Sequence, residues 1–289
     1  MTETLQGGCH VSHMHDGAPL TEGTLRIWNQ VGRATGAQAI SLRVMEFAPG
    51  MSPAIRNDDC DEILYVLDHD RIAVGDSSHG QAPSAPPLGK DSIDSSHPEG
   101  VRGKREVATI FIEGEQYEIG PDTGIYIRPG QTFALDNGGV ASINVISSRC
   151  PDPDRSPQFV SQPPSASHSN PGAPAPIVRL ADQRAQPTAD RWYRVMVDDA
   201  IGSAQVTQFV GSIPPGRAPD HFHNYEEVLF ILRGEGLMWA GETNTPIAPG
   251  SCIYLPRGQV HCVENTGEGE LRLLGLFYPA GSPSVRYEA

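Results

Sequence analysis

Residues 220–234 read DHFHNYEEVLFILRG, and this stretch joins two closely spaced histidines to an apolar run. Side chains alternate across a β-strand, so residues two positions apart share a face. His221 and His223 are therefore expected to point the same way. Glu227 lies an even number of positions further on, so it shares their face if the chain stays extended. Imidazole and carboxylate groups that converge on one point suit a divalent transition metal. The stretch thus predicts three ligands of one metal site.

The rest of the chain is typical of an all-β protein. Short runs rich in Val, Ile, Leu, Phe and Tyr recur between turn residues, among them ISLRVMEF, ATIFI, SINVIS, VLFIL and LRLLGLFY. Many short strands separated by regular turn signals favour a β-barrel or β-sandwich. Residues 151–177 are rich in Pro and Ser, which predicts an extended linker. We therefore expect a flexible N-terminus over 1–21, an N-terminal domain over 22–150 and a C-terminal domain over 178–289.

The two halves repeat each other. EILYVL (62–67) matches EVLFIL (227–232), and GIYIRPGQTFALDN (124–137) matches CIYLPRGQVHCVEN (252–265). An internal repeat predicts two copies of one architecture. Glu62 and Asn137 are 75 positions apart, whereas Glu227 and Asn265 are 38 apart, so the first copy carries about 37 additional residues. We expect this insertion at about 75–107, as a polar loop or lid.

A second motif supplies a fourth ligand, His261, in GSCIYLPRGQVHCVEN (250–265). The two motifs together resemble those of the cupins, and specifically the bicupins, whose patterns are G-x5-HxH-x3,4-E-x6-G and G-x5-PxG-x2-H-x3-N. The matching residues are Gly216, His221, His223, Glu227 and Gly234, with one residue fewer in the first interval, and then Gly250, Pro256, Gly258, His261 and Asn265. The resemblance implies two jelly-roll-like cupin β-barrels in tandem. It also implies one metal, held by three His and one Glu, in the C-terminal barrel.

The first half lacks the histidines of this motif. When residues 124–137 are aligned with 252–265 and Glu62 with Glu227, Phe133 takes the place of His261. The HxH positions are then filled by Arg56 and Asp58 or, with a shift of one residue, by Ile55 and Asn57. One carboxylate without imidazole is a poor site for a transition metal. We expect the first barrel to be structural; the alternative is a metal-free ligand pocket that uses Arg56.

Other side chains near the motifs are weaker candidates. Glu226 is expected to face solvent, and Cys262 is expected to pack on the face opposite to His261. The CHVSHMH cluster (9–15) is expected to lie in the flexible terminus. The candidates for clamping a substrate carboxylate are Arg217, Arg233 and Arg257, and those for donating a proton are Gln208, Tyr225 and Tyr254. No catalytic residue beyond the metal ligands is assigned.

Four protein ligands on an octahedral metal leave two coordination positions open, and an open site indicates reactivity. The resemblance implies one divalent transition metal, for which we favour Fe(II), with Mn(II), Ni(II) and Zn(II) as alternatives. We expect a dioxygenase-like oxidoreductase acting on a small oxygenated substrate. The alternatives are a non-redox lyase, decarboxylase or isomerase at the same site, and a metal-dependent protein that binds a small molecule without turnover.

Composition limits the partners and the compartment. With 21 Lys and Arg against 35 Asp and Glu, the net charge of −14 disfavours nucleic acids and anionic membrane surfaces. No apolar run approaches the roughly 18 residues that span a bilayer, and residues 1–17 lack the pattern of a secretory signal. Five cysteines without CxxC spacing predict free thiols, and hence a cytoplasmic protein. The expected partner is a small-molecule substrate. A second copy of the chain, in a homodimer, is a further candidate partner.

Overall fold

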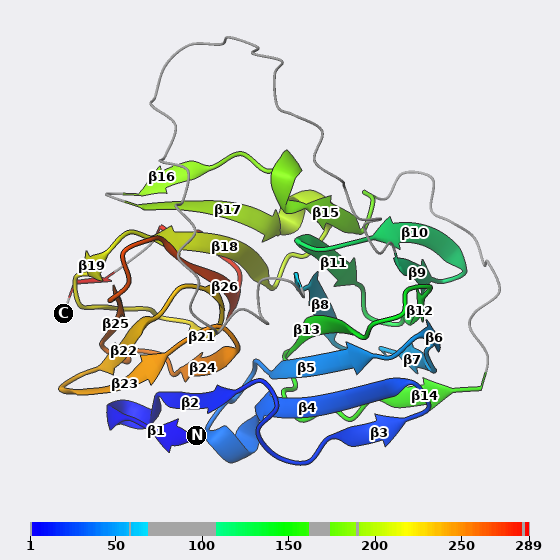
Figure 1. The fold of residues 1–289 in the computed structure, drawn as a ribbon, viewed down its shortest axis with the longest axis horizontal. Helices are drawn as coiled ribbons and strands as arrows, with labels where there is room; N and C mark the ends of the chain where they lie inside the picture. Colours follow the sequence, from blue (N-terminus) through cyan, green and yellow to red (C-terminus); the bar gives the residue numbers. More distant parts are fainter. Residues whose placement is uncertain are drawn as a thin grey trace, which may run out of the picture.

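The computed structural model describes residues 2–57, 59–68, 108–161, 174–188, 191–284 and 287–288. Within these residues the strands pair into four sheets, and the helical segments are short 3-10 turns. Two sheets form a barrel on each side of the molecule (Figure 1). The expected all-β architecture with two barrels is confirmed. None of the helices in the described residues has the length and apolar character needed to cross a membrane.

The N-terminal barrel packs a seven-stranded sheet against a six-stranded sheet. The larger sheet has the order β15-β11-β8-β13-β5-β4-β3, with bounds β3 (Leu20–Glu22), β4 (Leu25–Val31), β5 (Leu42–Phe47), β8 (Asp61–Val66), β11 (Thr123–Ile127), β13 (Ile143–Cys150) and β15 (Ile177–Arg179). The smaller sheet contains β6 (Gly50–Met51), β7 (Ala54–Arg56), β9 (Ala108–Ile112), β10 (Glu115–Ile119), β12 (Thr132–Asn137) and β14 (Gln158–Val160).

The C-terminal barrel packs an eight-stranded sheet against a six-stranded sheet. The larger sheet has the order β1-β2-β24-β21-β26-β18-β17-β16, with bounds β1 (Glu3–Thr4), β2 (His10–His13), β16 (Gln186–Thr188), β17 (Arg191–Val197), β18 (Thr207–Ile213), β21 (Glu226–Arg233), β24 (Ser251–Leu255) and β26 (Leu271–Tyr278). The smaller sheet contains β19 (Gly216–Arg217), β20 (His221–Phe222), β22 (Gly236–Ala240), β23 (Thr243–Ile247), β25 (His261–Asn265) and β27 (Tyr287–Glu288). The 3-10 turns are η1 (Gln6–Gly8), η2 (Arg33–Thr35), η3 (Leu180–Asp182) and η4 (Asp199–Ile201).

Two segments predicted to be irregular contain strands among their described residues. Residues 1–21 are not a flexible tail, because β2 pairs with β24 of the C-terminal barrel and buries Cys9 and Val11 in that barrel's core. The linker 151–177 contributes β14, which pairs with β7 of the N-terminal barrel, and its last residue begins β15, which pairs with β11. Phe159 and Ile177 pack against the core there. These strands cover sheet edges that would otherwise present unpaired backbone groups. The insertion predicted at 75–107 lies outside the described residues.

The strands that carry Glu62 and Glu227 are buried on both faces, which explains their continuous apolar sequences. In β21, Leu229 and Ile231 face the interior of the C-terminal barrel, as expected from the parity of Glu227. Val228 and Phe230 face the other way, into an apolar layer shared by the two barrels. The strand β8 behaves in the same way in the N-terminal barrel. The strands β8 and β21 therefore each turn one face toward the other barrel, across this shared apolar layer.

Strand register decides which residues of the N-terminal barrel stand at the positions of the histidines. Phe133 on β12 lies opposite Ile55 on β7, just as His261 on β25 lies opposite His221 on β20. The alignment shifted by one residue, with Ile55 and Asn57, is thus the correct one. Arg56 is exposed on the outer face of its strand, because neighbours alternate across a strand. The alternative of an interior ligand pocket built on Arg56 is therefore wrong.

Phe133 fills the interior of the N-terminal barrel, and its side chain has no exposed surface. We expect Phe133→Ala to lower the free energy of unfolding by about 3–5 kcal/mol, because it removes a buried ring and leaves a cavity. Urea unfolding of wild type and variant measures this loss. The metal content of the folded variant should stay at the wild-type value, since the predicted ligands lie in the other barrel. Loss of metal at unchanged stability would contradict this assignment.

Candidate metal site

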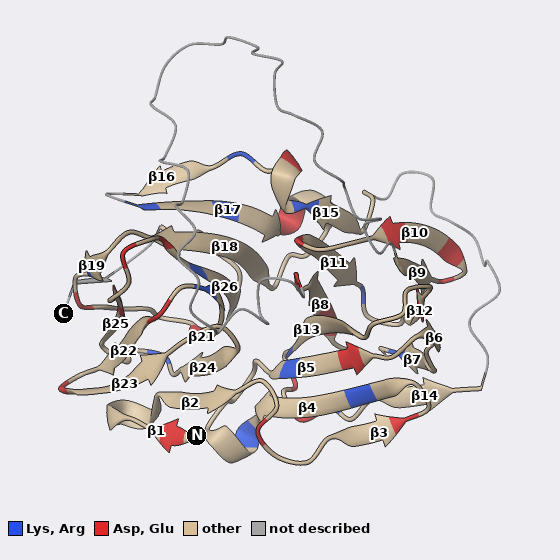
Figure 2. Ribbon diagram, in the orientation of Figure 1, with Lys and Arg blue, Asp and Glu red and all other residues tan. Residues whose placement is uncertain are grey.

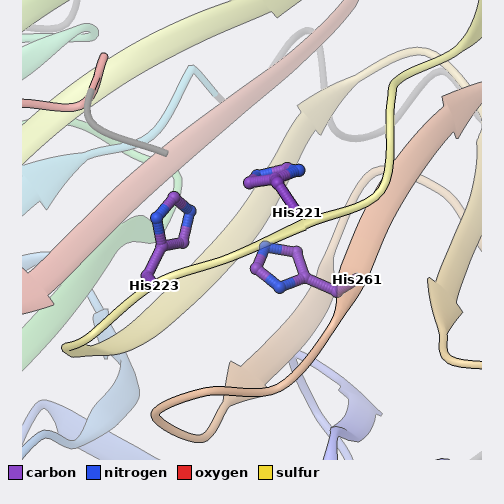
Figure 3. A group of neighbouring side chains, drawn as sticks. All are labelled: His221, His223 and His261. Carbon is purple, nitrogen blue, oxygen red and sulfur yellow. The ribbon is translucent and has the colours of Figure 1, made fainter. Parts of the chain in front are cut away.

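Three histidines of the C-terminal barrel come together as the sequence predicts. His221 on β20 pairs directly across the sheet with His261 on β25, and His223 follows one residue after β20. One ring nitrogen from each lies within 4.8 Å of the others. The rings of His221 and His261 are 4.5 Å apart between centroids, and all three surround a common space (Figure 3). We refer to His221, His223 and His261 as the three-histidine site.

Hydrogen bonds to the main chain set which ring nitrogen faces this space. The Nδ1 of His221 lies 3.0 Å from the carbonyl oxygen of Pro219, and that of His261 lies 2.8 Å from the carbonyl oxygen of Gln259. A carbonyl oxygen only accepts, so each Nδ1 carries the proton and donates it. The two Nε2 atoms are then unprotonated, as in protein metal sites where the second imidazole nitrogen donates to a carbonyl and Nε2 binds the metal. Burial lowers the pKa of His261 to about 4, which keeps its imidazole neutral at physiological pH.

His223 is held by a ring stack and by a main-chain hydrogen bond. Its ring stacks on Tyr225 at 4.5 Å between centroids, and Tyr225 stacks in turn on Phe277 at 4.3 Å. The carbonyl of His223 accepts a hydrogen bond from the backbone N–H of Gly258 at 2.8 Å, in the turn that leads to His261. The two histidine segments are therefore tied together by the backbone as well as by their rings.

Glu227 approaches the three-histidine site from the opposite sheet. Its Oε2 lies 3.7 Å from Nε2 of His223, and its side chain is almost fully buried. Burial raises the pKa of this carboxyl to about 8, because the charged form loses its hydration. A divalent cation between the imidazoles would stabilise the carboxylate form. Glu227 is thus within reach of the three-histidine site but outside the tightest group of ligand atoms.

The donor set fits a transition metal. Two imidazoles have a defined lone pair directed inward, a third is held beside them, and a buried carboxylate supplies negative charge. Neutral imidazoles with a carboxylate suit divalent Fe, Mn, Ni and Zn alike. Among the residues that the structure describes, this is the one group of three or more His, Cys, Asp or Glu side chains with such a spacing. The N-terminal histidines do not form a second group.

A cavity of about 100 Å³ opens onto the site. It is lined by Thr188, Arg191, Trp192, Tyr193, Phe209, Gly211, Ser212, Ile213, Ala218, His221, His223, Glu227, Leu229, His261, Val263, Leu273 and Pro283. Glu227 is the carboxylate among these residues, and Arg191 is the cationic side chain. Arg191 was not among the residues predicted from the sequence, because it lies far from both motifs at the start of β17. No local pattern distinguishes it from a solvated arginine.

Several weaker candidates lie elsewhere. Arg217, Arg233 and Arg257 are exposed and do not line the cavity. Figure 2 shows Lys and Arg positions scattered among Asp and Glu over both barrels. The hydroxyl of Tyr254 and the amide of Gln208 contact groups between the two barrels, so neither points at the metal ligands. Cys262 is buried beside Arg217, on the face opposite to His261 as expected, and the five cysteines are all free and buried.

Glu226 does not face solvent, contrary to expectation. Only 2% of its surface is exposed, and its carboxylate accepts hydrogen bonds from backbone N–H groups of residues 38–40. The prediction assumed that one face of β21 meets water. That face meets the N-terminal barrel instead.

Comparison with known proteins places these observations in a family. Residues 209–277 match the family model described as the cupin domain. The chain is 31% identical over 86 residues to an uncharacterized protein of Aquifex aeolicus, a match that covers 29% of this chain and 69% of that protein. It is 35% identical over 66 residues to the oxalate-binding protein of Thermotoga maritima, covering 22% and 54%. It is 32% identical over 83 residues to Auxin-binding protein 1 of Arabidopsis thaliana, covering 25% and 42%. The matches thus span from under half to about two thirds of these relatives.

Solved structures resemble the chain over nearly its whole length. A protein of Pseudomonas aeruginosa described as glyoxylate-induced superposes with a TM-score of 0.64 at 14% identity, over 97% of this chain and 91% of that one. A variant of Bacillus subtilis oxalate decarboxylase superposes with a TM-score of 0.66 at 12% identity, over 94% and 77%. At these identities the likeness establishes the fold, with two barrels in tandem.

Proposed function

This chain belongs to the cupin superfamily, and on that premise we propose that it is a metal-dependent enzyme acting on a small carboxylated substrate. The observation that carries the proposal is the three-histidine site with Glu227, since all four side chains line one cavity. A bound divalent metal supplies a Lewis acid that polarises a substrate oxygen and orients the substrate. The ligands are the three histidines and Glu227. The metal is one divalent transition ion, with Fe(II), Mn(II), Ni(II) and Zn(II) as the candidates.

The cavity favours a substrate of few atoms. An apolar protein cavity of roughly 150 Å³ admits benzene, whereas this cavity measures about 100 Å³. Arg191 lines the cavity, and a guanidinium forms planar bidentate contacts with a carboxylate. Apolar side chains such as Leu229, Val263 and Leu273 line the remaining wall and limit the entry of water. The name of the oxalate-binding relative supports the same class of ligand.

Within this class, we infer a decarboxylase- or lyase-type reaction as the function that the site supports best. A short dicarboxylic or oxo acid suits a cavity of about 100 Å³ better than a larger ring substrate does. The dioxygenase-like oxidoreductase is the second candidate, because four protein ligands leave room on an octahedral metal for a substrate and dioxygen together. Binding without turnover is the third, and the names of the oxalate-binding and auxin-binding relatives favour it.

The requirement for oxygen separates these candidates. Purified protein loaded with each metal in turn is incubated with a panel of two- to four-carbon acids, with and without dioxygen. Carbon dioxide release under anaerobic conditions supports the decarboxylase, and oxygen uptake that matches substrate loss supports the dioxygenase. Saturable binding with no product under either condition supports the binding protein. Absence of both binding and turnover across the panel contradicts the carboxylate proposal.

We expect the protein to hold close to one divalent metal per chain. The C-terminal barrel offers the complete ligand set, whereas Ile55 and Phe133 replace the paired histidines in the N-terminal barrel. Elemental analysis after dialysis against buffer without chelator measures the stoichiometry. Two tightly bound equivalents would show that the N-terminal barrel also binds metal.

A further inference from the structure

Glu226 lies between two predicted metal ligands in the sequence, yet its side chain belongs to the contact between the barrels. Its Oε1 accepts from the backbone N–H of Gln38 at 2.8 Å, and its Oε2 accepts from those of Ala39 at 2.8 Å and Ile40 at 3.2 Å. The hydroxyl of Tyr254 lies 3.0 Å from Oε1. Both oxygens of a carboxylate with 2% exposure are therefore satisfied, three of the contacts coming from the N-terminal barrel.

This arrangement fixes the start of β21. Hydrogen bonds to an ionised carboxylate are short and stronger than neutral ones, and the three amide donors are main-chain groups that do not rotate away. The next residue, Glu227, points to the opposite face of the same strand. His223 lies three positions before Glu226 in the sequence. A shift of Glu226 therefore displaces the backbone that carries both of these predicted ligands.

We propose that Glu226 is a positioning residue through which the N-terminal barrel holds Glu227 and His223 in place for the metal. The inference rests on the proposed metal site and assigns to the first barrel a part in it. The backbone N–H groups of residues 38–40 hold the start of β21 in the other barrel. The barrel that lacks the histidines thus contributes to the geometry of the barrel that has them.

The chain contains a matched control at the equivalent position of the first barrel. Asp61 precedes Glu62 on β8 as Glu226 precedes Glu227 on β21. Its Oδ2 accepts from Nε2 of Gln205 in the other barrel at 2.8 Å, and its Oδ1 accepts from the hydroxyl of Tyr126. Asp61 is 3% exposed. It also makes a contact between the barrels, but from a strand, β8, that carries no predicted metal ligand.

The test compares Glu226→Gln with Asp61→Asn, using Co(II) as the metal and a competing chelator to measure affinity. In Glu226→Gln, the carboxamide NH2 cannot accept from the amides of residues 38–40. We expect its Co(II) affinity to fall about 10–100-fold, the range seen when partners outside the ligand shell are removed, with an altered visible absorption spectrum. Asp61→Asn should lower the thermal midpoint but keep the Co(II) affinity and spectrum of wild type.

The inference is wrong if Glu226→Gln keeps the Co(II) affinity and spectrum of wild type and is destabilised only as much as Asp61→Asn. That result would leave the proposed metal site unaffected. A wild-type protein that binds no Co(II) would instead overturn the proposed function, and the inference with it. If Glu226→Gln fails to fold, Tyr254→Phe and Tyr126→Phe form a second matched pair. Tyr254→Phe should weaken Co(II) binding in the same direction, whereas Tyr126→Phe should not, and equal affinities in this pair would also overturn the inference.

Discussion

Replacing His261 by alanine is expected to abolish metal binding and activity while leaving both barrels folded. The variant loses one of three clustered imidazoles, so its metal affinity should fall by more than the roughly 10–100-fold that loss of an outer hydrogen-bond partner costs. Its stability should change little, because the apolar faces of β21 and β26 hold the C-terminal barrel together. The lost hydrogen bond to the carbonyl of Gln259 accounts for only about 0.5–1.5 kcal/mol.

Metal per chain, thermal midpoint and turnover are measured together on each variant. His223→Ala should behave like His261→Ala, because its ring belongs to the same cluster. His13→Ala is the control, since His13 is an exposed histidine on β2 outside the cluster. A His261→Ala protein that keeps its metal, or that loses activity only because it unfolds, would disprove the ligand assignment.

The histidines could be predicted from the sequence because their arrangement depends on local geometry. Alternation along a strand brings His221 and His223 to one face, and the second motif supplies His261, which the resemblance to the cupins assigns to the same site. The burial of Leu229 and Ile231 follows from the same alternation. Each of these predictions needs only the period of a strand and the order of the motifs.

The features that could not be predicted from the sequence depend on contacts between distant segments. An alternating strand normally exposes its polar face, which predicts a solvent-exposed Glu226, and nothing in the sequence says that a second barrel covers that face. The strand β2 was missed because its partner β24 lies some 240 residues away, and its few apolar residues make no periodic pattern. Arg191 enters the cavity through the packing of β17 on β18. Composition and spacing carry no information about such pairings.

The interior of the N-terminal barrel holds a buried ion pair that the sequence also gave no reason to expect. Oε2 of Glu62 lies 2.9 Å from Nη2 of Arg149, and both side chains are at most 2% exposed. The hydroxyl of Ser147 donates to the other oxygen of Glu62 at 2.7 Å. Register places Glu62 where Glu227 stands in the other barrel, and Arg149 where Phe277 stands. The same carboxylate position is therefore neutralised by a guanidinium in one barrel and lies beside imidazoles in the other.

We expect Arg149→Met to lower the free energy of unfolding by about 3–5 kcal/mol, because it leaves the Glu62 carboxylate buried without its partner. The nearby guanidinium of Arg43 does not replace it, since the carbonyl oxygens of Pro153 and Arg155 already hold it. Denaturant unfolding of the variant measures the loss, and metal per chain should stay unchanged.

The double variant Glu62→Leu with Arg149→Met should recover most of this stability, because apolar residues of similar volume often replace a buried ion pair without cost. A double variant as unstable as Arg149→Met would show that the hydrogen bonds of Arg149 to the carbonyls of Arg155 and Ser156 matter more than its charge. Recovery would mean that Arg149 is needed chiefly because Glu62 is there. The guanidinium would then do for this carboxylate what the proposed metal does for Glu227.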